Sequence, residues 1–209
     1  MMDIIPNALN KYLEDLLPPR DKQLTEMENY AAGNNFPIVG PQVGHLLFQL
    51  SRLYRPEKIF EMGSGFGYSA YWFARGAPES AITLTDQDEN NLRMARNWLE
   101  RGKFINRLEF ITGESIEILR KNRSEFDFIF IDIDKYDYPE AFRLAVERVR
   151  RGGLIIIDNL LWYGRVLDPA IEDRSTQGVR ETNMLLFQTP GIFSTLLPIR
   201  DGLGISLKL

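Results

Sequence analysis

Apolar positions follow two different patterns along the chain. In the first 55 residues they recur every three or four positions, which is the spacing of amphipathic helices. From residue 56 onward, short apolar runs of strand length alternate with helical segments. We therefore predict a single domain over residues 1–209. We expect its N-terminal helices (residues 1–55) to cover a ligand-binding site, and residues 56–209 to form an α/β core that binds the ligand.

The N-terminal part is predicted to hold three helices. Pro18 and Pro19 end the first helix, and Pro41 opens the third. Two interpretations of this region stay open. The helices either only cover the sheet, or the loop at Val39-Gly40 lies over a ligand while the first helix packs against a partner chain. The predicted helices span residues 9–17, 24–33 and 41–54.

The rest of the chain alternates strands with helices. This order predicts an α/β fold, with a doubly wound, mostly parallel seven-stranded sheet that carries helices on both faces. The last two strands are joined by Asp201-Gly202 and are expected to form an antiparallel hairpin. Helices are expected from Tyr68, from Asp88 to Gly102, after Ser115, and from Pro139 to Val149. The apolar runs lie at residues 58–60, 81–86, 108–112, 126–131, 154–157, 193–197 and 203–207.

A glycine turn follows the first predicted strand. Gly63, Gly65 and Gly67 stand at alternate positions, and a helical pattern begins at Tyr68. Glycine lets the backbone pass close to a ligand, and strand, glycine turn and helix form the nucleotide-binding start of a doubly wound sheet. The spacing G-x-G-x-G differs from the dinucleotide fingerprint, and the chain has no phosphate loop.

Two acids flank this turn. Glu61 precedes the glycines and would repel a pyrophosphate, but it suits an ammonium or sulfonium group. Asp86 ends the next strand, near the spacing expected for a carboxylate that binds ribose hydroxyls. Both acids could instead be solvated at the edge of a tight turn. Together with the glycines, they favour S-adenosylmethionine (SAM).

Polar clusters follow two central strands. Asp132, Asp134 and Lys135 come after one of them, and Asp158 with Asn159 after the next. The carboxyl ends of such strands meet at the ligand crevice, and two carboxylates with one amide suit a hard cation such as Mg²⁺, Ca²⁺ or Mn²⁺. Alternatively, the acids pair with Lys135 or cap a helix. Asp134 is expected to be a structural or ribose-side acid.

Composition narrows these possibilities. The chain has no cysteine and a single histidine, His45, which excludes disulfides and thiolate chemistry and leaves no His-rich metal site. The net charge of −4 and the lack of a dense basic run weigh against nucleic acid. No membrane-length apolar run and no signal-like N-terminus are present, so a cytoplasmic protein without a membrane partner is expected.

These motifs give the chain a family resemblance. From about Val39 to the C-terminus it resembles class I SAM-dependent O-methyltransferases of the caffeoyl-CoA / catechol O-methyltransferase family. Ile133 and Glu114 depart from the residues usual in that family. The first thirty-odd residues match no family pattern. The motifs are Glu61-Met-Gly-Ser-Gly-Phe-Gly-Tyr-Ser69, Phe130-Ile-Asp-Ile-Asp-Lys135, Asp158-Asn-Leu-Leu-Trp-Tyr-Gly-Arg-Val166 and Leu196-Leu-Pro-Ile-Arg-Asp-Gly202.

The resemblance implies specific roles. Lys135 would be the catalytic base, and Asp132, Asp158 and Asn159 would hold the divalent cation, with Mg²⁺ expected first. The family also implies a homodimer. The cofactor contacts would be Val39 (through its backbone), Glu61, Gly63, Ser69, Asp86, Glu114, Ser115 and Asp132.

The predicted reaction is metal-dependent methylation of an aromatic small molecule with two vicinal hydroxyls, of catechol or hydroxycinnamoyl type. A cation that binds both oxygens lowers the phenol pKa from about 10, and Lys135 accepts the proton. Residues 165–175 either form a mobile loop over the substrate or a surface connection. Trp162 either forms an aromatic wall or packs in the core.

Two other functions are considered. A tRNA hydroxyuridine O-methyltransferase would need a basic approach surface. A cofactor-binding module without catalysis is disfavoured, because the candidate base and metal ligands are all present: Asp132, Lys135, Asp158 and Asn159. The candidate basic residues for tRNA are Lys11, Arg20, Lys22, Arg52, Arg55 and Lys58.

Overall fold

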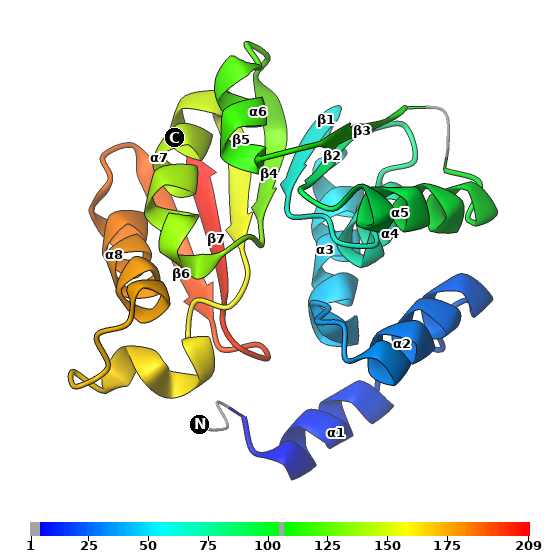
Figure 1. Cartoon of the computed structure of the whole chain (residues 1–209), viewed down its shortest axis with the longest axis horizontal. Helices are drawn as coiled ribbons and strands as arrows, with labels where there is room; N and C mark the ends of the chain where they lie inside the picture. The colour runs from blue at the N-terminus through cyan, green and yellow to red at the C-terminus, as the bar shows by residue number, and fades with distance from the viewer. Residues whose placement is uncertain (1–4, 105–106) are drawn as a thin grey trace.

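The computed structural model describes residues 5–104 and 107–209. These residues form a seven-stranded sheet in the order β3-β2-β1-β4-β5-β7-β6, with helices on both faces (Figure 1). The first five strands of this order are parallel, and β7 runs antiparallel to β5 and β6. The predicted fold class and C-terminal hairpin are confirmed. The strands are β1 (Lys58–Met62), β2 (Ala81–Asp86), β3 (Leu108–Thr112), β4 (Phe126–Ile131), β5 (Val149–Ile157), β6 (Ile192–Leu197) and β7 (Leu203–Lys208).

Alternation along the central strands divides the core into two layers. Ile59 of β1 pairs with Phe128 of β4, and both side chains enter one layer. Phe60 and Ile129, one position further along, enter the other layer. All four are fully buried, and each contributes about 1.5–3 kcal/mol through apolar burial. Apolar side chains are buried on both faces of these strands because helices cover both faces of the sheet.

Four helices form the layer beside β1, β2 and β3. Helix α3 packs closely on α4, since a Cβ atom at Gly44 would overlap the Trp72 indole. Asp21 caps α2 through the Leu24 N–H (2.9 Å), and Asp88 caps α5 through the Asn90 N–H (2.8 Å). The helices are α2 (Lys22–Asn34), α3 (Gly40–Tyr54), α4 (Tyr68–Gly76) and α5 (Glu89–Arg101).

The opposite layer holds three helices, seen at the left of Figure 1. Their buried residues, such as Leu119, Phe142 and Leu186, pack on β4 and β5. Two short 3₁₀ segments, η1 (Lys135–Asp137) and η2 (Trp162–Leu167), follow the ends of β4 and β5. The helices are α6 (Ser115–Lys121), α7 (Tyr138–Arg148) and α8 (Arg174–Gln188).

Helix α1 (Asn7–Asp15) stands apart from both layers (Figure 1). None of its residues is buried, and Leu9 and Tyr12 are largely exposed. Its Asn10 side chain accepts a hydrogen bond from Gln42 of α3 (2.7 Å). The first predicted helix therefore forms, but it does not cover the sheet.

One local prediction was wrong, and one helix was missed. Val149, expected in a helix, pairs with Phe126 as the first residue of β5, where a register shift follows. Helix α8 was not expected. In the segment 165–175, residues 168–173 form an irregular connection between the end of η2 and the start of α8. Among the described residues, no helix is both long enough and apolar enough to span a membrane.

The order of the strands reverses between β1 and β4. Loops leaving the two strands therefore diverge and leave a crevice at their carboxyl ends. The two loops are in close backbone contact at Gly63 (φ +80°), where a Cβ atom would overlap the carbonyl oxygen of Asp132. The Asp132 N–H also donates to the Met62 carbonyl (2.9 Å). Only glycine at position 63 lets the turn after β1 pack against the end of β4.

Candidate functional site

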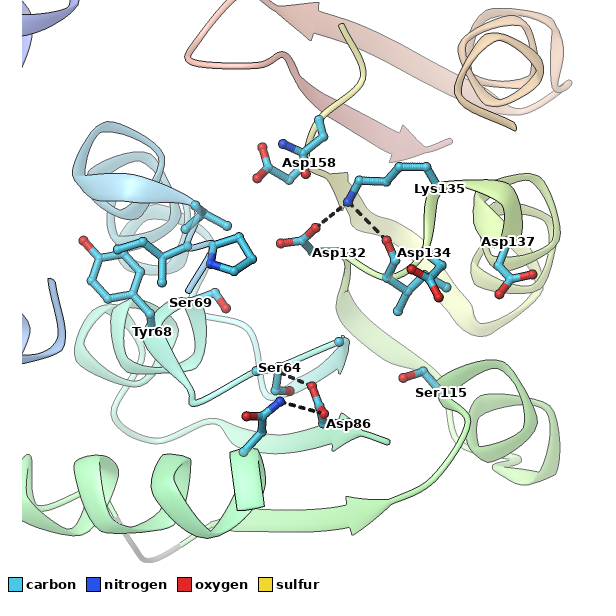
Figure 2. A pocket seen from close by; sticks show the side chains of 18 of the residues that line it. Ser64, Tyr68, Ser69, Asp86, Ser115, Asp132, Asp134, Lys135, Asp137 and Asp158 are labelled. Carbon is cyan, nitrogen blue, oxygen red and sulfur yellow. Dashed lines mark hydrogen bonds and ion pairs between the residues drawn. The ribbon is translucent and has the colours of Figure 1, made fainter. Parts of the chain in front are cut away.

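A cavity of about 570 Å³ opens at this crevice (Figure 2). That volume suits a small molecule with its cofactor. Lys135, Asp158 and Asn159 line it, together with the loop of residues 36–39. Among the residues that sequence assigned to the cofactor, Glu61 alone does not line the cavity. The other seven do: Val39, Gly63, Ser69, Asp86, Glu114, Ser115 and Asp132.

Asp86 fixes the glycine turn to the end of β2. Its Oδ2 accepts a hydrogen bond from the Gly65 N–H (2.9 Å). Its Oδ1 accepts from the Asp88 N–H (2.9 Å) and from Asn91 Nδ2 (3.1 Å), as Figure 2 shows in part. Gly65 itself has φ +50°, which favours glycine. The carboxylate is thus held in one orientation at the cavity wall.

Glu61 is fully buried at the end of β1, and no described residue gives either carboxyl oxygen a hydrogen-bond partner. Burial raises the pKa of Glu61 to about 7; the hydroxyls of Ser69 and Ser64 oppose this rise, and the charges of Asp132 and Asp86 add to it. Buried carboxylates without partners are rare. A positively charged or hydroxyl-bearing ligand in the adjacent cavity would offset this cost.

Lys135 begins η1, directly beyond the end of β4. Its Nζ donates to Asp132 Oδ1 (2.8 Å) and to the Ile133 carbonyl (3.1 Å). The same nitrogen lies over the ring of Tyr138 at 4.8 Å and over that of Trp162 at 5.8 Å from the centroids. The side chain is only 11% exposed. Figure 2 shows this amine pointing toward Asp132.

Asp158 directly follows β5, and its side chain is 1% exposed. Its Oδ2 accepts from Arg200 Nη1 (2.8 Å), while its Oδ1 has no partner among the described residues. Burial raises the pKa of Asp158 to about 7; Asp132 adds to the rise and Arg200 opposes it. Asn159 (φ +60°) donates Nδ2 to Asp201 Oδ2 (3.2 Å), which leaves the amide oxygen for a ligand.

The donor set fits a hard cation. Within the described part of the chain, Asp132, Asp158 and Asn159 each keep one side-chain oxygen that no hydrogen bond uses. No group of three or more His, Cys, Asp or Glu side chains in residues 5–104 and 107–209 is placed to hold a metal ion. The candidate set therefore consists of two carboxylates and one amide, which are oxygen ligands of the kind that Mg²⁺ and Ca²⁺ take.

The structure also shows where three other residues singled out from the sequence lie: Asp134, His45 and Trp162. Asp134 accepts a hydrogen bond from the Tyr136 hydroxyl (2.9 Å). His45 lies on α3 outside the cavity lining, with its ring 4.8 Å from that of Trp72. Burial lowers the pKa of His45. Trp162 lines the cavity beside Lys135 and so serves as a wall of the site.

Sequence reasoning missed several residues of the site. Tyr138 is fully buried, and its hydroxyl donates to the Asp158 carbonyl (3.0 Å) and lies 3.5 Å from Asp132 Oδ1. Arg200 and Asp201 were named only within a family motif and a predicted hairpin turn, although they contact Asp158 and Asn159, which follow β5. Their charges next to Gly202 were the available signal, because a plain hairpin turn does not require them.

The basic residues considered for tRNA are partly neutralised. Three of the six lie in ion pairs with carboxylates on the N-terminal helices. The two lysine pairs are largely exposed and contribute little to stability, but all three pairs reduce the free positive charge of this region. The pairs are Lys11–Asp15, Arg20–Glu28 and Lys22–Glu26.

Comparisons with known proteins agree with this geometry. A family model described as O-methyltransferase matches residues 17–209. A catechol O-methyltransferase from Niastella koreensis is 31% identical, and the match covers 99% of both chains. An O-methyltransferase from Bacillus cereus in complex with SAH has a TM-score of 0.87 at 31% identity, over 97% of both chains. TomG from Streptomyces achromogenes, involved in tomaymycin synthesis and solved with SAM, has a TM-score of 0.86 at 27% identity, over 97% of this chain and 96% of that one.

The sheet order, the cavity at its switch point and the likeness to structures solved with SAH or SAM identify a class I SAM-dependent methyltransferase. The chain belongs to the O-methyltransferase family. It is an enzyme that transfers a methyl group from SAM to a hydroxyl group.

Proposed function

We propose that this enzyme methylates one of two vicinal hydroxyls on an aromatic small molecule, with a divalent cation at Asp132, Asp158 and Asn159. The observation that carries the proposal is the placement of Lys135. Its amine lies 2.8 Å from a carboxylate of the donor set and lines the same cavity as the glycine turn. The proposed base, the oxygen donors and the glycine turn thus line one cavity.

SAM is proposed to lie along the glycine turn. Asp86 is held rigid by three donors and is suited to the ribose hydroxyls. Glu61 lies behind Ser64 and Ser69, where its charge would attract the cationic methionine end. Val39, in the loop before α3, is 3% exposed and would close the cavity over the ligand.

The reaction needs a nucleophilic oxygen aimed at the methyl group. A cation at the donor set would supply Lewis-acid chemistry that lowers the pKa of the acceptor hydroxyls. Lys135, in its neutral form, takes the hydroxyl proton at Nζ. Asp132 and the rings of Tyr138 and Trp162 then stabilise the resulting ammonium. Fixed orientation of the two reactants supplies much of the acceleration.

The acceptor is proposed to be catechol-like or hydroxycinnamoyl-like. Trp162 and Tyr163 line the cavity on the side of Lys135 and offer flat apolar surfaces for an aromatic ring. The catechol O-methyltransferase from Niastella koreensis, similar over nearly its whole length, supports this class. Mg²⁺ is the first candidate for the cation, with Mn²⁺ and Ca²⁺ as the others.

The proposal is tested by transfer of a labelled methyl group from SAM to caffeate, with Mg²⁺ and with EDTA. We expect transfer with Mg²⁺ that EDTA abolishes and added Mg²⁺ restores. Transfer that EDTA leaves unchanged would contradict the metal. Label that enters bulk tRNA but no catechol would favour the hydroxyuridine alternative.

The chain is further proposed to form a homodimer through α1. Leu9, Tyr12 and Leu16 expose 48%, 59% and 63% of their surface, which is an apolar stripe without cover in this structure. Light scattering coupled to size exclusion tests this proposal. A dimer that Tyr12→Glu converts to a monomer is the expected result, and a monomeric wild type would contradict it.

A further inference from the structure

Arg200 has an unusual backbone conformation for its residue type. It lies in the turn between β6 and β7 with φ +52°, a left-handed region that L side chains rarely adopt. Gly202 follows two residues later with φ +90°. A glycine at position 200 would fit the turn without strain. The arginine therefore stands there at a conformational cost that a glycine would not carry.

The Arg200 side chain lines the cavity. Its Nη1 donates to Asp158 Oδ2 at 2.8 Å. Its stem lies near the start of α3, where a Cβ atom added at Gly40 would be 3.6 Å from Arg200 Cδ. The guanidinium thus stands beside a donor of the candidate cation site.

The positive charge of Arg200 opposes the binding of a divalent cation at Asp158. The Asp158 side chain is 1% exposed, so solvent does little to screen charges near it. A guanidinium and a divalent cation that share one buried carboxylate repel each other. The contact also satisfies Asp158 Oδ2, an oxygen that would otherwise be free for a metal. A cation bound at the free Oδ1 would therefore meet the repulsion of the guanidinium across the same carboxylate.

We propose that Arg200 is a built-in counter-cation of Asp158, which competes with the divalent cation and sets the affinity of the site for it. The inference rests on the cation site of the proposed function and adds a residue that tunes it. It makes this enzyme bind divalent cations more weakly than its three oxygen donors alone would allow.

The test is direct titration of Mn²⁺ into wild type and Arg200→Gly by calorimetry. We expect the glycine variant to bind Mn²⁺ at least about tenfold more tightly, which corresponds to about 1.4 kcal/mol. Arg200→Lys retains the positive charge and should stay near the wild-type affinity. Equal or weaker binding by Arg200→Gly would overturn the inference, and so would an equal gain in Arg200→Lys.

The control variant is Arg143→Ala. Arg143 also pairs with a carboxylate, Glu181 at 2.5 Å, but on the surface between α7 and α8. It is expected to leave Mn²⁺ affinity unchanged. A gain equal to that of Arg200→Gly would mean that overall charge is responsible, and would overturn the inference.

The titration separates this inference from the proposed function. If Mn²⁺ binds both proteins and Arg200→Gly binds more tightly, the inference stands even where EDTA leaves methyl transfer unchanged, although the proposed metal-dependent reaction then fails. If EDTA abolishes transfer and Arg200→Gly binds no more tightly, only the inference fails. If neither protein binds Mn²⁺, release of Asp158 does not create a site, and the inference is wrong.

Discussion

Gly178 of α8 packs its backbone directly against the backbone of Lys135. A Cβ atom at position 178 would overlap the carbonyl oxygen of Lys135 and would lie 2.9 Å from the Tyr136 Cα atom. The glycine is thus the point where a helix late in the chain holds the 3₁₀ segment that carries the proposed base. A methyl group there must push η1 or α8 away.

Gly178→Ala is therefore expected to reduce methyl transfer although residue 178 does not line the cavity. Displacement of η1 moves the Lys135 amine, and a misplacement of about 1 Å can cost on the order of 10²-fold in rate. The substitution should also lower the melting temperature because of overpacking. Steady-state kinetics and thermal unfolding of the same preparations provide the measurement, with kcat more affected than the Kd for SAM.

Gly33→Ala is the matched control. Gly33 lies within α2, and a Cβ atom there would meet no atom within 4 Å. Alanine in a helix is favoured over glycine by up to about 1 kcal/mol, so this variant should be slightly more stable and equally active. If Gly178→Ala behaved in the same way, the packing argument for Lys135 would be wrong.

Lys135→Met is expected to abolish methyl transfer and to retain SAM binding. Methionine preserves most of the side-chain volume between Tyr138 and Trp162 but cannot accept a proton. Loss of a general base costs about 10²–10⁴-fold. Calorimetric titration with SAM and a radiolabel transfer assay measure the two effects separately. A large loss of SAM affinity, with turnover preserved at saturating SAM, would show instead that Lys135 shapes the cofactor pocket.

Glu61 should make the cofactor-free enzyme less stable as pH rises. Its folded pKa of about 7 exceeds its ordinary value of 4.5. Between these values the folded state holds more protons than the unfolded state, so the free energy of unfolding falls as pH rises toward 7. The difference between the two pKa values corresponds to a loss on the order of 3 kcal/mol in the free energy of unfolding. Binding of cationic SAM should offset this loss.

Glu61→Gln removes this titration, since the amide stays neutral. The variant should melt higher than wild type at pH 8, with a smaller difference at pH 5, and should bind SAM more weakly. Melting curves at both pH values, with and without SAM, make the comparison. Asp158 titrates in a similar range, so some pH dependence will persist. An unchanged melting temperature at pH 8 would contradict the cost assigned to Glu61.

Asp158→Asn is expected to remove the response of the enzyme to Mg²⁺. The amide keeps the size of the side chain and can still accept a hydrogen bond from Arg200, but it lacks the negative charge that a hard cation requires. Initial rates measured across a Mg²⁺ titration should be low and flat. A rate that still rises with Mg²⁺ to the wild-type level would place the cation elsewhere.

The sequence predicts the sheet well because its strands carry local signals. Residues 128–131 of β4 and 154–157 of β5 are apolar at every position, and the glycines at 63, 65 and 67 mark a turn with positive φ. The residues that bear chemistry follow these strands directly. Their convergence needs only the rule that carboxyl ends of parallel strands meet at the crevice.

The parts that were missed depend on contacts across the fold. Helix α8 contains Gly178, which disfavours a helix locally and is retained where the backbone meets Lys135. Val149 fits a helical stripe and enters β5 only because Phe126 is available as its partner. Arg200 donates a hydrogen bond to Asp158, which lies 42 positions earlier in the sequence. No local sequence pattern predicts a contact over that separation.

The order of the strands also places the walls assigned to SAM and the walls assigned to the acceptor in two different stretches of the sequence. The walls assigned to SAM come from the glycine turn and the ends of β2 and β3, all before residue 116 apart from Asp132. The walls assigned to the acceptor come from segments after residue 131. Exchange of residues 159–202 between relatives should therefore change which acceptor is methylated and leave the SAM pocket in place. Diversification of acceptors within such a fold needs no redesign of its methyl donor site.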